Sequence, residues 1–170
     1  MNYYNEIKTE LINNEITKKV KNYSINRSDL TTYYNVGKLL AEAGKHYGEG
    51  ITKEYSEKLT ADLNKKYSYR SLNYMMKFYE LQKMQSVTAN LSWGHWIELL
   101  SIKNINEMKY YINQAEKLFL TTRELRQRIK NNEYERLDES TKEKLKEKEE
   151  LKVPDLVKNP IQIKNTSGNN

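Results

Sequence analysis

The sequence predicts an all-α fold, a multi-helix domain that contains a helix-turn-helix unit. Glycine (6 residues) and proline (2 residues) are scarce among the 170 residues, and both prolines, Pro154 and Pro160, lie near the end. Apolar residues recur at the three- and four-residue spacing of a buried helix face, and long strand-like runs are absent. Nearly the whole chain before Pro154 can therefore be helical.

Two helices are expected at the start of the chain. The first covers residues 2–22, and the second begins near Ser28 or Asp29, either of which can cap free backbone amides. The second helix ends at the glycines of residues 44–50. Gly37 falls within its apolar stripe, and a missing side chain there lets two backbones approach. The sequence therefore predicts a close helix crossing at this glycine.

The next two helices form the expected helix-turn-helix. They cover residues 52–66 and about 71–82, and the turn Tyr67–Arg70 joins them. In such units the second helix enters the major groove of DNA while the first crosses the phosphate backbone. A connector over residues 84–91 and a short apolar helix over 92–100 follow.

Capping boxes predict the helices of the second half of the chain. In each box a polar side chain accepts from an amide of the first turn, and an acid three residues later returns a hydrogen bond. The boxes are Asn104 with Glu107 for a helix to about 118, Thr121 with Glu124 for one to about 134, and Ser140 with Glu143 for one over 141–152. The last of these is rich in Lys and Glu, which predicts a solvated helix or a frayed tail. We expect a helical domain over 1–137, a charged helix over 138–153 and a disordered tail over 154–170.

Charge favours a polyanionic partner. The chain has 29 Lys and Arg against 23 Asp and Glu, a net charge of +6, and residues 138–170 hold seven of each sign. The surplus therefore lies in residues 1–137, and nucleic acid is the commonest partner of such a basic body. No cysteine and only two histidines are present, so no metal or other cofactor is expected. Without a signal pattern or an apolar run of bilayer length, we expect a cytoplasmic protein with no membrane contact.

Two groups of residues are candidates for nucleic-acid binding. Arginine can fork onto guanine, asparagine onto adenine, and lysine or tyrosine can contact phosphate. An ordinary amphipathic helix pair, or an ordinary solvated helix face, would show the same residue types. The first group is Lys65, Lys66, Arg70, Asn73, Tyr74 and Lys77, and the second is Arg123, Arg126 and Lys130, with Arg128 and Arg136 nearby.

The segment around His95 is predicted to be part of the core. Trp93 and Trp96 flank this histidine, which would also suit a base-stacking platform. However, both tryptophans share one helical stripe with Ile97 and Leu100, which favours core packing. His95 is then expected at the edge of the core with a hydrogen-bond partner.

Catalysis has little support in the sequence. There is no cysteine nucleophile, no Ser/His/Asp pattern and no phosphate-cradling glycine-rich loop. The triplet Glu150-Leu151-Lys152 matches the end of a metal-dependent nuclease motif, but such a triplet arises by chance in a Lys/Glu-rich helix. We therefore expect a protein that is not an enzyme.

Several stretches, taken together and in order over about residues 15–137, resemble the YhcG N-terminal domain family. The most specific are Leu91–His95, which contains Trp-Gly-His, and Thr121–Ile129, which contains Glu-Leu-Arg. The others are Tyr34–Leu40, Tyr47-Gly48, Leu59–Leu63, Tyr69–Met75, Phe78-Tyr79, Leu99-Leu100 and Tyr110-Tyr111.

The resemblance implies a winged-helix-like DNA-binding region. In full-length members a PD-(D/E)xK nuclease domain follows this region, and Pro154–Pro160 looks like the linker where that domain would begin. The expectation is therefore a nuclease-associated module that binds DNA without cleaving it, as a regulator or a mobile-element accessory protein. The alternative is a phage- or plasmid-encoded inhibitor that contacts a host defence nuclease, such as a CRISPR effector or a restriction enzyme. The tyrosine-rich first two helices could also pair with a second copy.

Overall fold

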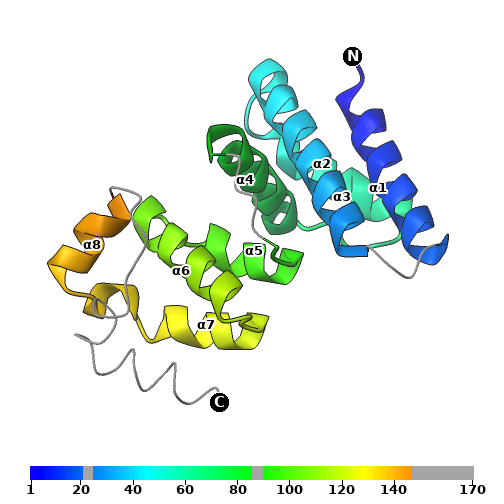
Figure 1. Ribbon diagram of the computed structural model, residues 1–170. Helices are drawn as coiled ribbons and strands as arrows, with labels where there is room; N and C mark the ends of the chain where they lie inside the picture. The colour runs from blue at the N-terminus through cyan, green and yellow to red at the C-terminus, as the bar shows by residue number, and fades with distance from the viewer. Residues whose placement is uncertain (21–24, 86–89, 147–170) are drawn as a thin grey trace. The chain divides into compact units, whose positions relative to one another are not determined.

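The computed structural model describes residues 1–20, 25–85 and 90–146, and all the regular structure in these ranges is helical (Figure 1). This confirms the all-α prediction. No β-strand occurs in the described ranges, so they contain no β-wing of the kind that a winged helix carries. The chain divides into two compact units, an N-terminal unit of residues 1–88 and a C-terminal unit of residues 89–170. The segment expected to form one domain, 1–137, thus includes parts of both units.

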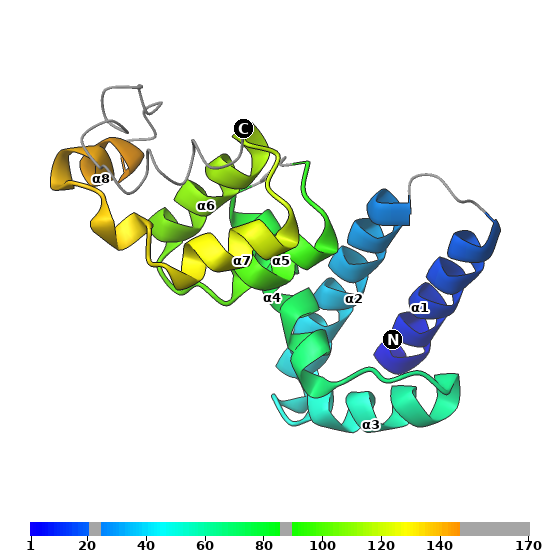
Figure 2. The same ribbon diagram turned by 90° about the horizontal axis from the view of Figure 1, so that it is seen from below.

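The N-terminal unit consists of four helices: α1 (Tyr3–Val20), α2 (Ile25–Tyr47), α3 (Ile51–Leu63) and α4 (Tyr69–Gln85). Helix α2 is central and packs most extensively on α4 and then on α1, while α3 lies across the ends of α1 and α2 (Figure 2). The core is aliphatic at the α1–α2 contact and continues into the other two helices. Its fully buried members include Ile7, Leu11, Val36, Leu40, Leu59 and Leu72.

Gly37 is the point of closest approach between α2 and α4. A Cβ atom placed on this glycine would lie 2.1 Å from the carbonyl oxygen of Met75 and 3.0 Å from the Cβ of Tyr79. No side chain fits at such distances unless the helices move apart. The predicted close crossing is therefore confirmed, and its partner is the backbone of α4.

The C-terminal unit is built around α6 (Ile105–Lys117), which contacts every other helix of the unit. The others are α5 (Trp93–Leu100), α7 (Thr122–Lys130), the short 3-10 helix η1 (Tyr134–Arg136) and α8 (Glu139–Lys146). Large side chains fill the core, led by Trp96, Leu99, Tyr110, Tyr111 and Leu125. Burying tryptophan and tyrosine supplies much apolar contact from a few short helices.

Two of the three predicted helix caps are present. The Thr121 side chain accepts from the Glu124 amide, and the Glu124 carboxylate accepts from the Thr121 amide at 2.7 Å, which completes the capping box. Asn104 accepts from the amides of Asn106 (2.9 Å) and Glu107 (3.4 Å), so α6 has its cap without the reciprocal bond.

The third predicted cap, Ser140, is wrong. Helix α8 already begins at Glu139, and Asp138 accepts from the Thr141 amide at 2.8 Å in the way that a cap residue does. Aspartate caps a helix as well as serine. Thr141 and Leu145 are four residues apart and therefore lie on one face of α8, which contacts α6. Both are buried, so the described part of the helix that was expected over 141–152 packs on α6 through one face, and residues 147–152 lie outside the described residues. The predicted tail over 154–170 lies outside the described residues.

Helices α3 and α7 end earlier than the sequence predicted, and in each case an asparagine in the left-handed conformation follows the helix. Asn64 (φ 48°) ends α3 at Leu63 rather than Lys66, and Asn132 (φ 54°) follows the end of α7 at Lys130, short of Tyr134. Asparagine tolerates this conformation better than most residues because its short polar side chain bonds locally.

The starts of α2 and α4 also differ from expectation. Helix α2 begins at Ile25, and Asp29 does not cap it but accepts from the Asn14 amide group of α1 at 2.8 Å. Helix α4 begins at Tyr69, two residues before the expected Ser71. Ser68 accepts from the Ser71 amide at 3.1 Å, as a cap side chain would.

Candidate nucleic-acid interface

The predicted binding residues fall on both units. Lys65, Lys66, Arg70, Asn73, Tyr74 and Lys77 belong to the N-terminal unit, whereas Arg123, Arg126 and Lys130 belong to α7 of the C-terminal unit. Each group is therefore described within its own unit.

The first turns of α4 hold two cations against one tyrosine. The Arg70 guanidinium donates to the Tyr74 hydroxyl from Nε (3.3 Å) and Nη2 (3.1 Å), and its carbon lies 5.6 Å from the centre of the Tyr74 ring. The Lys77 ammonium lies 5.8 Å from the same ring centre. Attraction between a cation and the ring face holds both side chains near Tyr74 without neutralising their charge.

Helix periodicity makes this cluster accessible. Leu72, Met75 and Phe78 turn one side of α4 into the core. Arg70, Asn73, Tyr74 and Lys77 are spaced three and four residues from one another, so they share the other side of the helix. Arg70 and Lys77 are exposed, and Asn73 and Tyr74 are half-buried. We call Arg70, Asn73, Tyr74 and Lys77 the α4 face.

The two lysines that precede α4 have different surroundings. Lys65 forms an ion pair with Glu15 of α1 at 2.5 Å and lies 5.8 Å from the centre of the Tyr67 ring, so it ties the turn to α1. Lys66 is exposed and makes no ion pair with the described residues. Of the two, Lys66 is the one whose charge is open to an external anion.

On α7 the predicted basic stripe is only partly open. Arg123 and Lys130 are exposed and make no ion pair with the described residues. Arg126 donates to a carboxylate oxygen of Glu98 on α5 from Nε (2.9 Å) and Nη2 (2.7 Å). Arg128 is buried beside the fully buried Glu133, with Nη1 and Oε2 3.5 Å apart, so it is not part of a phosphate-contacting surface. Its position on the inner side of α7 explains this, because Leu125, three residues earlier, is also buried.

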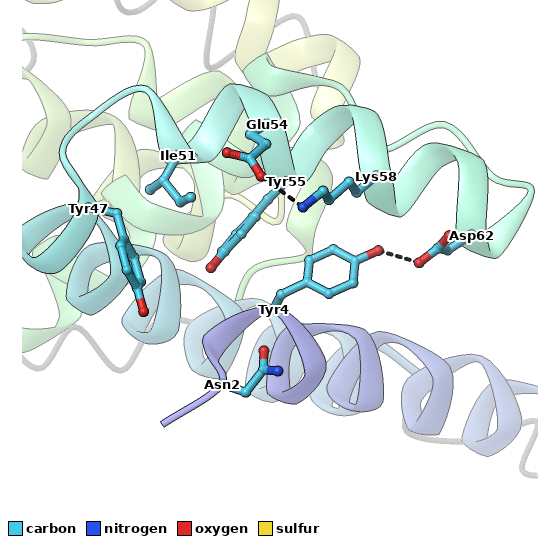
Figure 3. A pocket seen from close by; sticks show the side chains of 8 residues that line it. All are labelled: Asn2, Tyr4, Tyr47, Ile51, Glu54, Tyr55, Lys58 and Asp62. Carbon is cyan, nitrogen blue, oxygen red and sulfur yellow. Dashed lines mark hydrogen bonds and ion pairs between the residues drawn. The ribbon is translucent and has the colours of Figure 1, made fainter.

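A pocket of about 660 Å³ lies elsewhere in the N-terminal unit, between the start of α1, the end of α2 and α3 (Figure 3). Its size suits a small ligand, but its charged groups already pair with one another. Figure 3 shows the Tyr4 hydroxyl directed at Asp62 (2.5 Å) and the Lys58 ammonium directed at Glu54 (2.8 Å). Lys8 donates to the same Asp62 oxygen at 3.1 Å. We interpret this pocket as a polar joint between α1 and α3.

The contact between Tyr4 and Asp62 in this pocket predicts how the stability of the protein depends on pH. Burial, followed by the hydrogen bond to Asp62 and the charge of Asp62, raises the pKa of Tyr4 from 10.0 to about 12. A raised pKa means that the folded state favours the neutral phenol, so its contribution to stability is complete below pH 10 and is lost as the pH rises to about 12. We expect wild type to be more stable than Tyr4→Phe below pH 10, and this advantage to disappear toward pH 12. Urea unfolding followed by circular dichroism checks this, and a difference that stays constant over the range would contradict it.

The segment around His95 belongs to the core only in part: Trp96 and Leu100 of the predicted stripe are buried, whereas Trp93 and Ile97 are half-buried. Trp96 is 1% exposed, and His95 is half-buried. The carbonyl oxygen of Leu120 lies 2.7 Å from His95 Nε2 and can only accept, so Nε2 carries the proton; Nδ1 accepts from the Ser92 amide at 3.2 Å. A Cβ on Gly94 would lie 3.0 Å from Thr122 Oγ1, so this glycine lets α5 approach α7 closely. The segment therefore joins α5 to the α6–α7 loop and α7.

The family model of the DUF1016 N-terminal domain matches residues 6–136. The chain belongs to this family. It is the YhcG N-terminal family to which the sequence motifs pointed. Comparisons with curated proteins and with solved structures gave no match. The DUF1016 N-terminal domain includes the described helices α1–α7 and η1, and so extends over both compact units.

The motifs that carry the resemblance mainly lie where helices of the DUF1016 N-terminal fold meet or begin. Gly37 permits the α2–α4 crossing, His95 bonds the α6–α7 loop, and Thr121 caps α7. Family membership therefore supports the architecture more directly than it supports any contact face. Glu150 lies outside the described residues, and no described helix is long and apolar enough to cross a membrane.

Sequence reasoning did not single out Phe119, an exposed aromatic residue in the loop between α6 and α7. The sequence could have indicated this residue only through an absence at the end of α6. No glycine or asparagine stands between the predicted end of α6 at Leu118 and the cap Thr121. Some other residue must then take the left-handed position that commonly ends a helix.

Proposed function

We propose that this chain is a non-catalytic nucleic-acid-binding domain whose main contact surface on duplex DNA is the α4 face. The observation that carries this proposal is the pair of exposed cations, Arg70 and Lys77, held at one tyrosine on the first turns of a helix. Cations that are ordered but unneutralised lose little freedom on binding an anion and keep their full charge for it. The basic N-terminal unit, with 14 Lys and Arg against 10 Asp and Glu over residues 1–88, supports the same partner.

In this proposal α3 and α4 act as a helix-turn-helix, with α4 as the recognition helix. Arg70 and Asn73 read base edges, and Lys66 and Lys77 contact phosphates on either side. The exposed side of α3 carries Glu54, Glu57 and Asp62 as well as its lysines, so α3 contributes little attraction for phosphates. Contact is therefore centred on the turn and on the start of α4.

The proposal predicts salt-dependent binding of modest steepness. If Lys66 and Lys77, the two phosphate contacts, each replace one counterion, the logarithm of affinity should fall with the logarithm of salt with a slope of about −2. Fluorescence anisotropy of a labelled 20-bp duplex between about 50 and 200 mM salt measures this slope. We expect Arg70→Ala to weaken binding about tenfold, and Lys77→Ala to reduce the slope by about 1.

Lys83→Ala is the matched control, because Lys83 is also exposed on α4 but lies beyond the α4 face. Its loss removes the same charge and should leave both affinity and slope nearly unchanged. Equal effects of Lys83→Ala and Lys77→Ala would show that only net charge matters, which would contradict a defined contact face. Absence of duplex binding by the wild-type chain at low salt would overturn the proposed function.

A further inference from the structure

The loop between α6 and α7 presents an aromatic side chain to solvent from a strained backbone position. Phe119 is 91% exposed and has a φ of 50°. The left-handed region crowds any Cβ against the backbone, and it is a genuine outlier for a bulky residue. The other described non-glycine residues with positive φ are Asn64 and Asn132, which belong to the type that tolerates it. Phe119 is therefore an exception within this chain.

Both sides of Phe119 are fixed by the fold. The Leu120 amide donates to the Ala115 carbonyl at 3.0 Å, the bond that closes the end of α6, and the Leu120 side chain is buried. The Leu120 carbonyl accepts from His95 Nε2, and α7 begins immediately afterwards with its Thr121 cap. The strain is thus imposed on position 119, and burial of the ring does not offset it. Backbone strain of this kind gathers where a residue has a functional contact to make.

Two cations flank Phe119 in the sequence, Lys117 two residues before it and Arg123 four residues after it. Lys117 and Arg123 are exposed and make no ion pair with the described residues. Two carboxylates also flank Phe119 and keep their charge, but their oxygens face backbone amides: Glu116 accepts from the Asn90 amide (3.3 Å), and Glu124 accepts from the Thr121 amide (2.7 Å). An exposed ring with an exposed cation on either side of it along the chain suits a nucleic-acid strand, which offers flat bases between phosphates.

We propose that Phe119 stacks on an unpaired nucleic-acid base while Lys117 and Arg123 contact the neighbouring phosphates. This inference rests on the proposed function and adds to it a preference for single-stranded or unpaired segments. An unpaired base offers its face freely, whereas insertion between paired bases must first break a stacked step. The free energy that one ring gains by stacking on a base is about as large as the free energy needed to unstack one step of paired bases. The unpaired base is therefore the favoured target.

The test combines stability with binding in the full chain. We expect Phe119→Gly to raise the Tm by about 3 °C, because glycine relieves the left-handed strain. The same variant should bind a labelled 20-nucleotide single strand about tenfold more weakly, and a fully paired 20-bp duplex within about twofold of wild type. Phe119→Tyr should retain most of the single-strand affinity. In a duplex with one unpaired 2-aminopurine, wild type but not Phe119→Gly should quench the fluorescence of that base.

Asn132→Gly is the matched control, since it changes another exposed left-handed residue of the same unit and should leave binding unaltered. Single-strand binding by Phe119→Gly equal to wild type, a lowered Tm, or equal loss on the paired duplex would each overturn this inference while leaving the proposed function standing. Absence of any nucleic-acid binding by wild type would overturn both. If Phe119→Gly abolished self-association in sedimentation velocity and left nucleic-acid binding intact, the ring would instead contact a second copy.

Discussion

Replacing Gly37 by alanine is expected to lower the free energy of unfolding by about 3 kcal/mol. The added methyl carbon would lie 2.1 Å from the carbonyl oxygen of Met75, well inside van der Waals contact. The obstacle is backbone rather than the end of a flexible side chain, so α2 and α4 must separate along their shared core. This contact is the most extensive one between helices of the N-terminal unit, and its loosening exposes apolar surface on both helices.

Gly44→Ala is the control for this prediction, because Gly44 lies in the same helix and a Cβ there meets no atom within 4 Å. Alanine at that position should stabilise the protein by about 0.5–1 kcal/mol through its better helix propensity. Urea unfolding followed by circular dichroism at 222 nm measures both variants. If Gly37→Ala were as stable as Gly44→Ala, the close crossing of α2 and α4 would be wrong.

Local signals in the sequence predicted the parts of the fold that depend on one or a few neighbouring residues. Thr121 and Glu124 formed the expected box because both partners lie within one turn. Gly37 was recognisable because glycine inside an apolar stripe has few other physical explanations. The ends of α3 and α7 were not predictable in this way, because asparagine is common both inside helices and in the left-handed position that ends them. The burial of Thr141 and Leu145 depends on packing of α8 against α6, which periodicity alone does not show.

The sequence predicted which residue types form the candidate site, but it did not predict which of its cations form ion pairs with acidic residues elsewhere in the fold. Arg70, Tyr74 and Lys77 lie within two turns of one helix, so their proximity follows from spacing. The partners of Lys65 and Arg126 are 50 and 28 residues away, and only the tertiary fold brings Glu15 and Glu98 to them. These pairs narrow the set of cations available to an external anion.

The interior of the C-terminal unit contains a charged pair, and breaking it is the second large effect that we expect. Arg128 is 5% exposed and Glu133 is fully buried, and the two are 3.5 Å apart. The tyrosine hydroxyl of Tyr111 donates to the Arg128 carbonyl (3.3 Å) and accepts from the Tyr134 amide (3.2 Å), which fixes the turn that brings the pair together. Removing Arg128 takes the positive charge of this ion pair away from a carboxylate that is fully buried.

Arg128→Met is therefore expected to destabilise the protein by about 3–5 kcal/mol, the usual cost of removing one partner from a buried ion pair. Methionine retains much of the apolar stem, so the loss reports the uncompensated charge more than a cavity. The exposed Arg123 of the same helix provides the control, and Arg123→Met should change stability by less than about 0.5 kcal/mol. Urea unfolding followed by the fluorescence of Trp93 and Trp96, which both lie in α5, measures the effect in this unit.

Removing the second charge should restore much of the lost stability. In Arg128→Met with Glu133→Leu both charges are gone, and replacing a buried pair by apolar groups of similar volume is often close to neutral. A single variant as stable as Arg123→Met, or a deficit that the second substitution leaves unchanged, would mean that the Glu133 carboxylate reaches solvent. In that case Arg128 would be an ordinary surface cation, available to phosphates as its sequence position alone suggested.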